Sequence, residues 1–118
     1  PAANTAPTSG ANGLNQGVAA SLNRLVLQAQ LVERSPLRYT PAGLPALNFV
    51  LKHEGQARED SQMRSVAVEI RSKAIGHSIT ASLAAHALGK EAVFTGFLAA
   101  ARNGRGVVFH VNTVDLLS

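Results

Sequence analysis

The side chains of this sequence that could carry out recognition chemistry are cations spread over turns and alternating segments, together with one tyrosine. Arginine and lysine bind phosphate oxygens, and a tyrosine ring offers a flat face on which a nucleic-acid base can stack. The net charge of the chain is +4, which favours a polyanionic partner because clustered cations attract phosphates. The candidate nucleic-acid-binding side chains are Arg38, Tyr39, Lys52, Arg64, Arg71, Arg102 and Arg105.

The same sequence offers little for catalysis or for metal binding. Cysteine is absent, and no two histidines have the i, i+4 spacing with which a helix presents a pair of imidazoles to a metal. Glu54, Glu59 and Asp60 lie in a polar segment with basic neighbours, which is typical of solvated charges. No glycine-rich phosphate loop precedes a helix, and no nucleophile elbow occurs. We therefore expect a protein that is not an enzyme and has no catalytic residue, metal or cofactor.

Residues 1–22 differ in composition from the rest of the chain. They contain no charged residue and consist mainly of Ala, Asn, Gly, Ser, Thr and Pro, so they cannot bury enough apolar surface to offset the entropy of ordering. We expect a flexible leader over 1–22 and a single folded domain over 23–118. No apolar run approaches the roughly 20 residues that span a bilayer, and the pattern of a secretory signal is missing. We therefore expect a cytoplasmic protein with no membrane partner.

Three segments in the first half of the domain alternate between apolar and polar residues, which predicts β-strands. The first covers about 23–34, the second is centred on 47–52, and the third covers 63–72. The first two are joined by a loop over 35–45 that contains three prolines and a glycine. The polar residues over 55–61 predict a second loop.

The second half of the domain changes its period once. Apolar residues recur at helical spacing within 78–88, and Gly89 supplies a stop for the helix. Two further strands follow, joined by the turn-forming pair Asn103-Gly104, and they cover 91–100 and 107–116. The order is therefore β-β-β-α-β-β. This order predicts an all-β fold, a five-stranded OB-fold barrel with one α-helix between strands three and four.

An OB-fold usually binds its ligand on the second and third strands, between the loops that join strands one and two and strands four and five. The candidate cations and Tyr39 fall on these strands and loops, which supports them as a set. Phe49, Phe94 and Phe109 alternate with Leu and Val residues and are expected in the core. Phe97 lies on the opposite face of its strand from Phe94.

Short motifs along the whole domain are similar to those of a family of replication proteins. The motifs are Asn23-Arg24-Leu25-Val26-Leu27, Ser35-Pro36-Leu37-Arg38, Pro41-Ala42-Gly43-Leu44-Pro45, Asn48-Phe49-Val50-Leu51, Gly96-Phe97-Leu98, Asn103-Gly104 and His110. Through them residues 23–117 resemble the primosomal replication protein N (PriB) family. Segment 37–43 is also similar to the related single-stranded DNA-binding protein (SSB) family. The lack of tryptophan and of an acidic tail favours PriB, and a truncated SSB is the alternative.

The resemblance implies a homodimeric OB-fold that binds single-stranded DNA, acts with the helicase PriA and other primosome proteins in replication restart, and catalyses nothing. Two departures weaken the implied DNA site. Ala67, with Glu69 beside it, stands where known members carry a tryptophan, and the loop between the last two strands keeps only Arg102 and Arg105. We therefore expect weaker or more electrostatic binding than in those members. The alternative function is a protein-interaction adaptor with weak DNA binding.

Overall fold

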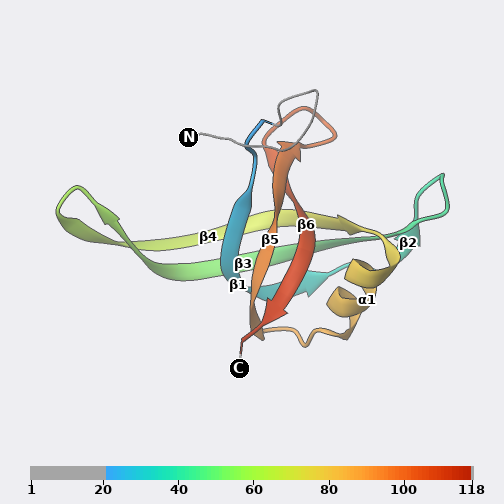
Figure 1. The fold of residues 1–118 in the computed structure, drawn as a ribbon, viewed down its shortest axis with the longest axis horizontal. Coiled ribbons are helices and arrows are strands. Elements are labelled where there is room, and N and C mark those ends of the chain that lie inside the picture. Colours follow the sequence, from blue (N-terminus) through green and yellow to red (C-terminus); the bar gives the residue numbers. More distant parts are fainter. Residues whose placement is uncertain (1–20, 118) are drawn as a thin grey trace.

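The computed structural model describes residues 21–117, so the predicted leader lies, except for its last two residues, outside the described part of the chain. Six strands and one helix follow in order (Figure 1). They are β1 (Leu25–Arg34), β2 (Arg38–Tyr39), β3 (Pro45–Glu59), β4 (Gln62–Ile75), α1 (His77–Ala85), β5 (Glu91–Ala100) and β6 (Val107–Leu116). The two-residue β2 lies in the predicted proline-rich loop, so the long strands are the five that the alternation predicted.

The five long strands close into a barrel because β1 pairs with two neighbours. The sheet runs β1-β5-β6-β4-β3-β2, and β1 also pairs with β3. The first half of β1 pairs with β5 and the second half with β3, with Val32 as an extra residue in the register. Such a bulge bends a strand and increases its twist, which allows β1 to pair with β5 in its first half and with β3 in its second half. A short parallel pairing of β4 with β6 completes the closure.

The inward faces of the strands make one core. Leu31, Leu51, Phe94 and Phe109 are fully buried, and Phe49 is nearly so. Each such side chain contributes roughly 1.5–3 kcal/mol by leaving water. The alternation therefore predicted correctly the buried faces of β1, β3, β5 and β6 and the phenylalanines that form the core, whereas on β4 the predicted apolar face includes Val68, which is 44% exposed.

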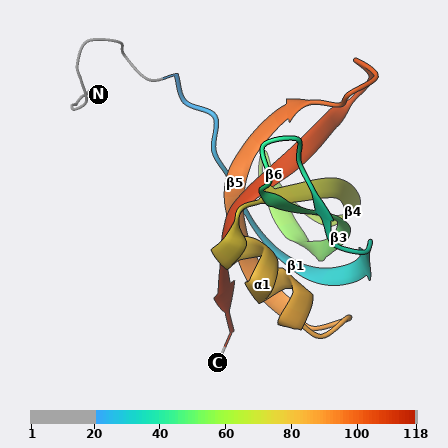
Figure 2. The same ribbon diagram turned by 90° about the vertical axis from the view of Figure 1, so that its right-hand side faces the viewer.

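Helix α1 covers one end of the barrel (Figure 2), and its Leu83 is part of the core. The helix begins after Gly76, whose φ of 126° suits glycine. It ends at Ala85, three residues before the predicted end. At that end the Arg34 guanidinium donates hydrogen bonds to the carbonyl oxygens of Leu83 and His86, at 3.0 and 2.6 Å. A side chain from β1 thus satisfies carbonyls that a helix end leaves without partners.

The predicted loop over 55–61 was wrong, because β3 and β4 continue through it as a long hairpin that projects from the barrel (Figure 1). The pairing is regular as far as Glu59 and Gln62, and Asp60 makes the turn with φ 58°. Aspartate tolerates this left-handed conformation. The polar composition, which indicated a loop, instead reflects a hairpin exposed to solvent on both faces.

Gly96 fixes how β5 lies against β6. A Cβ atom at this position would overlap the carbonyl oxygen of His110, so only glycine allows the two backbones to approach so closely. The register shifts at the same point, where Thr95 pairs with Thr113 and Gly96 with Val111. The close approach sets Phe97 directly opposite His110 on the outer face of the barrel.

Candidate functional site

A groove of about 760 Å³ lies on the outer face of the barrel. It lies over β3, β4 and the start of β6, between the segment after β1 and the β5–β6 loop. Its lining includes five cationic side chains and a single carboxylate, that of Glu33. We call this the cationic groove, and its cations are Arg34, Arg38, Arg71, Lys73 and Arg102.

The strand register places the groove cations in neighbouring rows. Lys73 on β4 pairs with Asn48 on β3, and Arg71 pairs with Val50. All four residues point outward, because the alternate positions Phe49 and Ser72 are buried. The floor of the cationic groove is therefore the outer face of two central strands, which positions the cations firmly.

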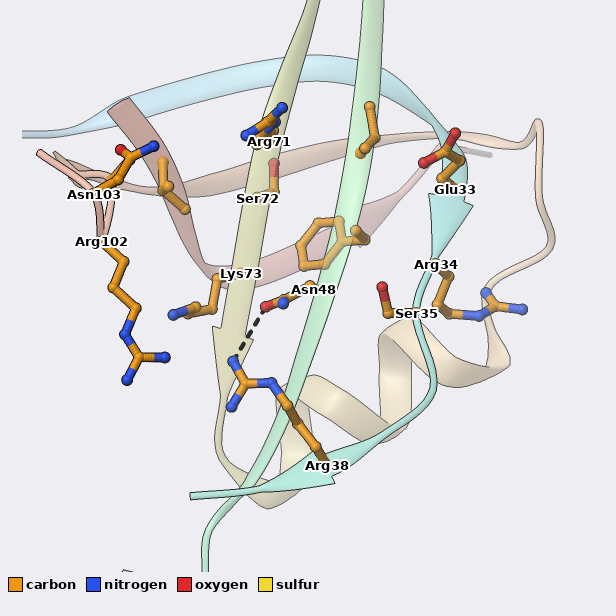
Figure 3. Close-up of a pocket in the computed structure, with 14 residues that line it drawn as sticks. Glu33, Arg34, Ser35, Arg38, Asn48, Arg71, Ser72, Lys73, Arg102 and Asn103 are labelled. Atoms are coloured by element: carbon orange, nitrogen blue, oxygen red, sulfur yellow. Dashed lines mark hydrogen bonds between the residues drawn. The ribbon is translucent and has the colours of Figure 1, made fainter. Parts of the chain in front are cut away.

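Two loops bring further cations to the floor. Arg38, on β2, donates a hydrogen bond of 3.3 Å to Oδ1 of Asn48, which holds its guanidinium over β3. Arg102 comes from the β5–β6 loop, where the Gly104 N–H donates to the carbonyl of Ala101 at 2.8 Å. Figure 3 shows Arg38, Lys73 and Arg102 around one opening, while Arg34 turns away from it.

In the part of the chain that the structure describes, none of the groove cations forms an ion pair with a carboxylate. Within residues 21–117 the ion pairs are Lys52–Glu54 at 3.7 Å and Arg64–Glu59 at 2.8 Å, both on the surface. Neither pair includes a groove cation. Uncompensated like charges in one concavity create a positive potential that attracts anions, and the open shape leaves room for a chain of phosphates.

Three of the seven predicted binding residues meet in this groove: Arg38, Arg71 and Arg102. Tyr39 is 64% exposed but belongs to the other side of β2 from Arg38, because neighbouring residues of a strand face opposite ways. Arg105 lies in the same loop as Arg102, and its N–H donates to Oδ1 of Asn103 at 2.8 Å. Neither Tyr39 nor Arg105 lines the groove.

The other two predicted residues lie along the long hairpin. Lys52 is on the same outward face as Val50 but beyond the groove, in register with Glu69 and ion-paired with Glu54. Arg64 lies near the hairpin tip, on the opposite face of β4 from Arg71, and is ion-paired with Glu59. The structure therefore does not bring Lys52 and Arg64 together with the groove cations.

The sequence prediction missed Arg34, Asn48 and Lys73. Lys73 lies on the same face of β4 as Arg71 and could have been found by extending the predicted strand, which ended at residue 72, by one residue. Arg34 follows the bulge in β1, where the alternation shifts, and its two hydrogen bonds to the end of α1 give it a structural task as well.

His110 borders the cationic groove on β6, in register with Lys73. Burial, and to a lesser degree the positive charge of Lys73, lower the pKa of His110 below its usual value. Its imidazole is therefore held in the neutral form more strongly than an exposed histidine. The ring of Phe97 stacks on it, with ring centroids 4.9 Å apart.

A second histidine serves packing. His86 is buried, forms a hydrogen bond of 2.8 Å between Nε2 and the carbonyl of Lys90, and meets the ring of Phe94 edge-on. Across residues 21–117 no group of three or more His, Asp or Glu side chains is placed to hold a metal ion. In the same part of the chain, no helix has both the length and the apolar character needed to cross a membrane.

A closed barrel of five long strands, in which β1 pairs with two neighbours and a helix covers one end between the third and fourth long strands, defines the OB-fold class. A family model described as "Another single-strand binding protein family" matches residues 23–113. The replication restart protein PriB of Bordetella pertussis is 42% identical over 81 residues, which cover 69% of this chain and 75% of that protein. The chain therefore belongs to the PriB proteins of this single-strand binding family.

Further relatives agree with this assignment. PriB of Neisseria meningitidis serogroup B is 46% identical over 55 residues, covering 46% of this chain and 55% of that protein. The solved structure of PriB from Ralstonia solanacearum has a TM-score of 0.74 and 38% identity, and covers 81% of this chain and 98% of that one. The SSB domain of a Synechococcus protein, at 20% identity and a TM-score of 0.64 over 83% of this chain and 99% of that one, shares the fold.

Proposed function

We propose that this protein binds single-stranded DNA in the cationic groove and serves bacterial replication restart without catalysing a reaction. The observation that carries the proposal is the set of cations Arg38, Arg71, Lys73 and Arg102 on one concave face, none of them in an ion pair within the described chain. Membership among the PriB proteins supports the biological role. The full proposal adds a cytoplasmic homodimer that acts with the helicase PriA and other primosome proteins.

The cationic groove suits a single DNA strand that is bound through its phosphate backbone. Phosphates of a single strand are spaced along the chain, and the groove offers cations from two strands and two loops at its floor and rims. Contacts of this kind carry little base-sequence information. Tyr39, Lys52, Arg64 and Arg105 remain predicted contacts outside the groove.

The test is a titration of the whole chain with labelled oligothymidine at several salt concentrations. Each phosphate contact on a single strand contributes a slope of about 0.7 in log affinity against log salt. If the four cations each meet a phosphate, we expect a slope near −2.8. A slope near zero, or no binding at low salt, would overturn the proposal.

The adaptor function is the second candidate, and one region favours it. Beyond the groove the outer face carries Glu54 and Glu69 around Lys52, with Ala67 where an aromatic ring would provide stacking. A protein that co-purifies with the helicase in stoichiometric amounts but fails the salt titration would be an adaptor.

A further inference from the structure

A pair of stacked rings lies on the outer face of the barrel where β5 meets β6. Phe97 and His110 pair in register, and their rings stack with centroids 4.9 Å apart and planes 10° apart. Phe97 remains 37% exposed. A partly exposed aromatic ring beside a cationic groove is available to stack with a planar group such as a nucleic-acid base.

The pair continues the cationic groove. His110 pairs with Lys73, and Lys73 pairs with Asn48, so one row of outward side chains runs from Phe97 across β6 and β4 to β3. Val108, two residues before His110 on the same face of β6, lines the groove itself. His110 therefore lies next to Lys73 in this row, and Phe97 lies next to His110 on the side away from Lys73.

The other aromatic side chains of the described chain are not available at this place. Phe49, Phe94 and Phe109 are core residues, with at most 3% exposed. Tyr39 is exposed but lies on the side of β2 away from the groove. Among residues 21–117, Phe97 is thus the aromatic residue that is both exposed and in contact with His110, the neighbour of the groove cation Lys73.

The backbone holds the rings in place before any ligand arrives. Gly96 brings β5 so close to β6 that a side chain at position 96 would overlap the backbone of His110. This approach fixes the strand on which Phe97 stands. A rigid ring loses little entropy on binding, so its contact energy is retained.

We propose that Phe97 and His110 form a base-stacking subsite at the end of the cationic groove, in which a base of the single strand lies on the face of Phe97 that His110 leaves open, while the neighbouring phosphates of the strand run past His110 to Lys73. The subsite rests on the proposed function, because it needs a nucleic-acid strand in the groove. Base–aromatic stacking is tolerant of sequence, since every base has a π-face. The lowered pKa of His110 is consistent with a neutral ring that supports Phe97 from behind.

The first experiment uses the absence of tryptophan from the chain. In Phe97→Trp the new indole is the sole tryptophan, and stacking of a base should strongly quench its fluorescence when oligothymidine is added. The matched control is Met63→Trp, because Met63 is also exposed but lies near the tip of the long hairpin. We expect no comparable quenching in the control.

The second experiment separates bases from phosphates. Phe97→Leu should weaken binding of oligothymidine by about tenfold, the loss of one stacked base. The same variant should bind an abasic oligodeoxyribose phosphate of equal length as the parent does, with an unchanged salt slope. Met63→Leu should change neither affinity, and melting curves of all variants check the fold.

The outcomes distinguish the proposed stacking subsite from the proposed binding of single-stranded DNA in the cationic groove. Equal losses on both oligomers, or steep salt-dependent binding with no effect of Phe97→Leu and no quenching in Phe97→Trp, would overturn the subsite and leave the groove as proposed. Failure of the parent protein to bind either oligomer would overturn the proposed function and the subsite with it.

Discussion

Arg71 lies on the floor of the cationic groove, and Arg102 comes from the β5–β6 loop at its rim. Replacing both with glutamine removes two of the expected phosphate contacts while keeping much of each side chain. We expect single-strand affinity to fall and the salt slope to become shallower by up to about 1.4. Fluorescence anisotropy at several salt concentrations measures both quantities.

Arg58 is the matched control for that variant. It is an exposed arginine of the same long hairpin, but it lies near the tip, in register with Met63, and is not among the predicted DNA contacts. Arg58→Gln should leave the salt slope where it is. If it reduced the slope as much as the groove variant does, the protein would bind DNA by its overall charge rather than in the groove.

The lowered pKa of His110 predicts a pH dependence of stability. The folded state binds the proton less tightly than the unfolded chain, so stability from this group is fully present above about pH 6.5 and is lost as pH falls through and below that value. His110→Gln should therefore lose less stability than the parent between about pH 7.5 and about pH 5.5. Urea midpoints at both pH values give the comparison.

The pH profile of His110→Gln is compared directly with that of the parent protein. A His110→Gln profile that matched the parent would mean that other groups set the acid sensitivity of the fold.

At the scale of elements, Arg34 joins β1 to the end of α1. Arg34→Met removes two charge-assisted hydrogen bonds to helix carbonyls while keeping much of the side chain. We expect a loss of about 1–2 kcal/mol in the free energy of unfolding, measured by urea denaturation. Arg38→Met removes a single hydrogen bond between exposed side chains and should cost less than about 0.5 kcal/mol. Equal effects would show that the helix end does not depend on Arg34.

Most elements could be predicted because their signals are local. Alternation in 23–34 and 91–100 indicated strands and their buried faces, and the Asn103-Gly104 pair indicated a turn. The β3–β4 hairpin escaped because polar residues on both faces of a solvated hairpin have no apolar period to detect. The end of α1 escaped because Arg34, far away in the sequence, determines it.

The candidate site could be predicted only in part, for the same physical reason. Three of its cations lie where the barrel order places them, but the set as a whole depends on pairings between distant segments. Lys73 meets His110 through the parallel pairing of β4 with β6, and the bulge at Val32 decides what Arg34 reaches. No periodicity within one segment contains that information.

At the scale of the whole molecule, β1 has an edge that the barrel does not fill. Its residues before Gln30 pair with β5 on one side only, because pairing with β3 begins at Gln30, and Val26 on this stretch is 48% exposed. Open edges are places where a second chain can add a strand. We therefore expect the homodimer implied by the PriB resemblance to form by pairing of β1 with β1 of a second copy.

We predict that sedimentation equilibrium of the whole chain at about 10–100 μM, a range in which interfaces of modest affinity are occupied, gives the mass of a dimer. Val26→Lys should shift the equilibrium towards monomer, since a lysine on an open edge opposes strand addition through its charge and its need for water. Val68→Lys is the matched control, because Val68 is a valine of similar exposure on the long hairpin. A parent chain that sediments as a monomer contradicts the dimer, whereas a dimer unaffected by Val26→Lys places the interface on another face. If Val26→Lys is monomeric, DNA titrations of this variant test whether one cationic groove binds on its own. Two grooves joined in a dimer raise the affinity for a long DNA strand, because the second groove binds at a high effective concentration.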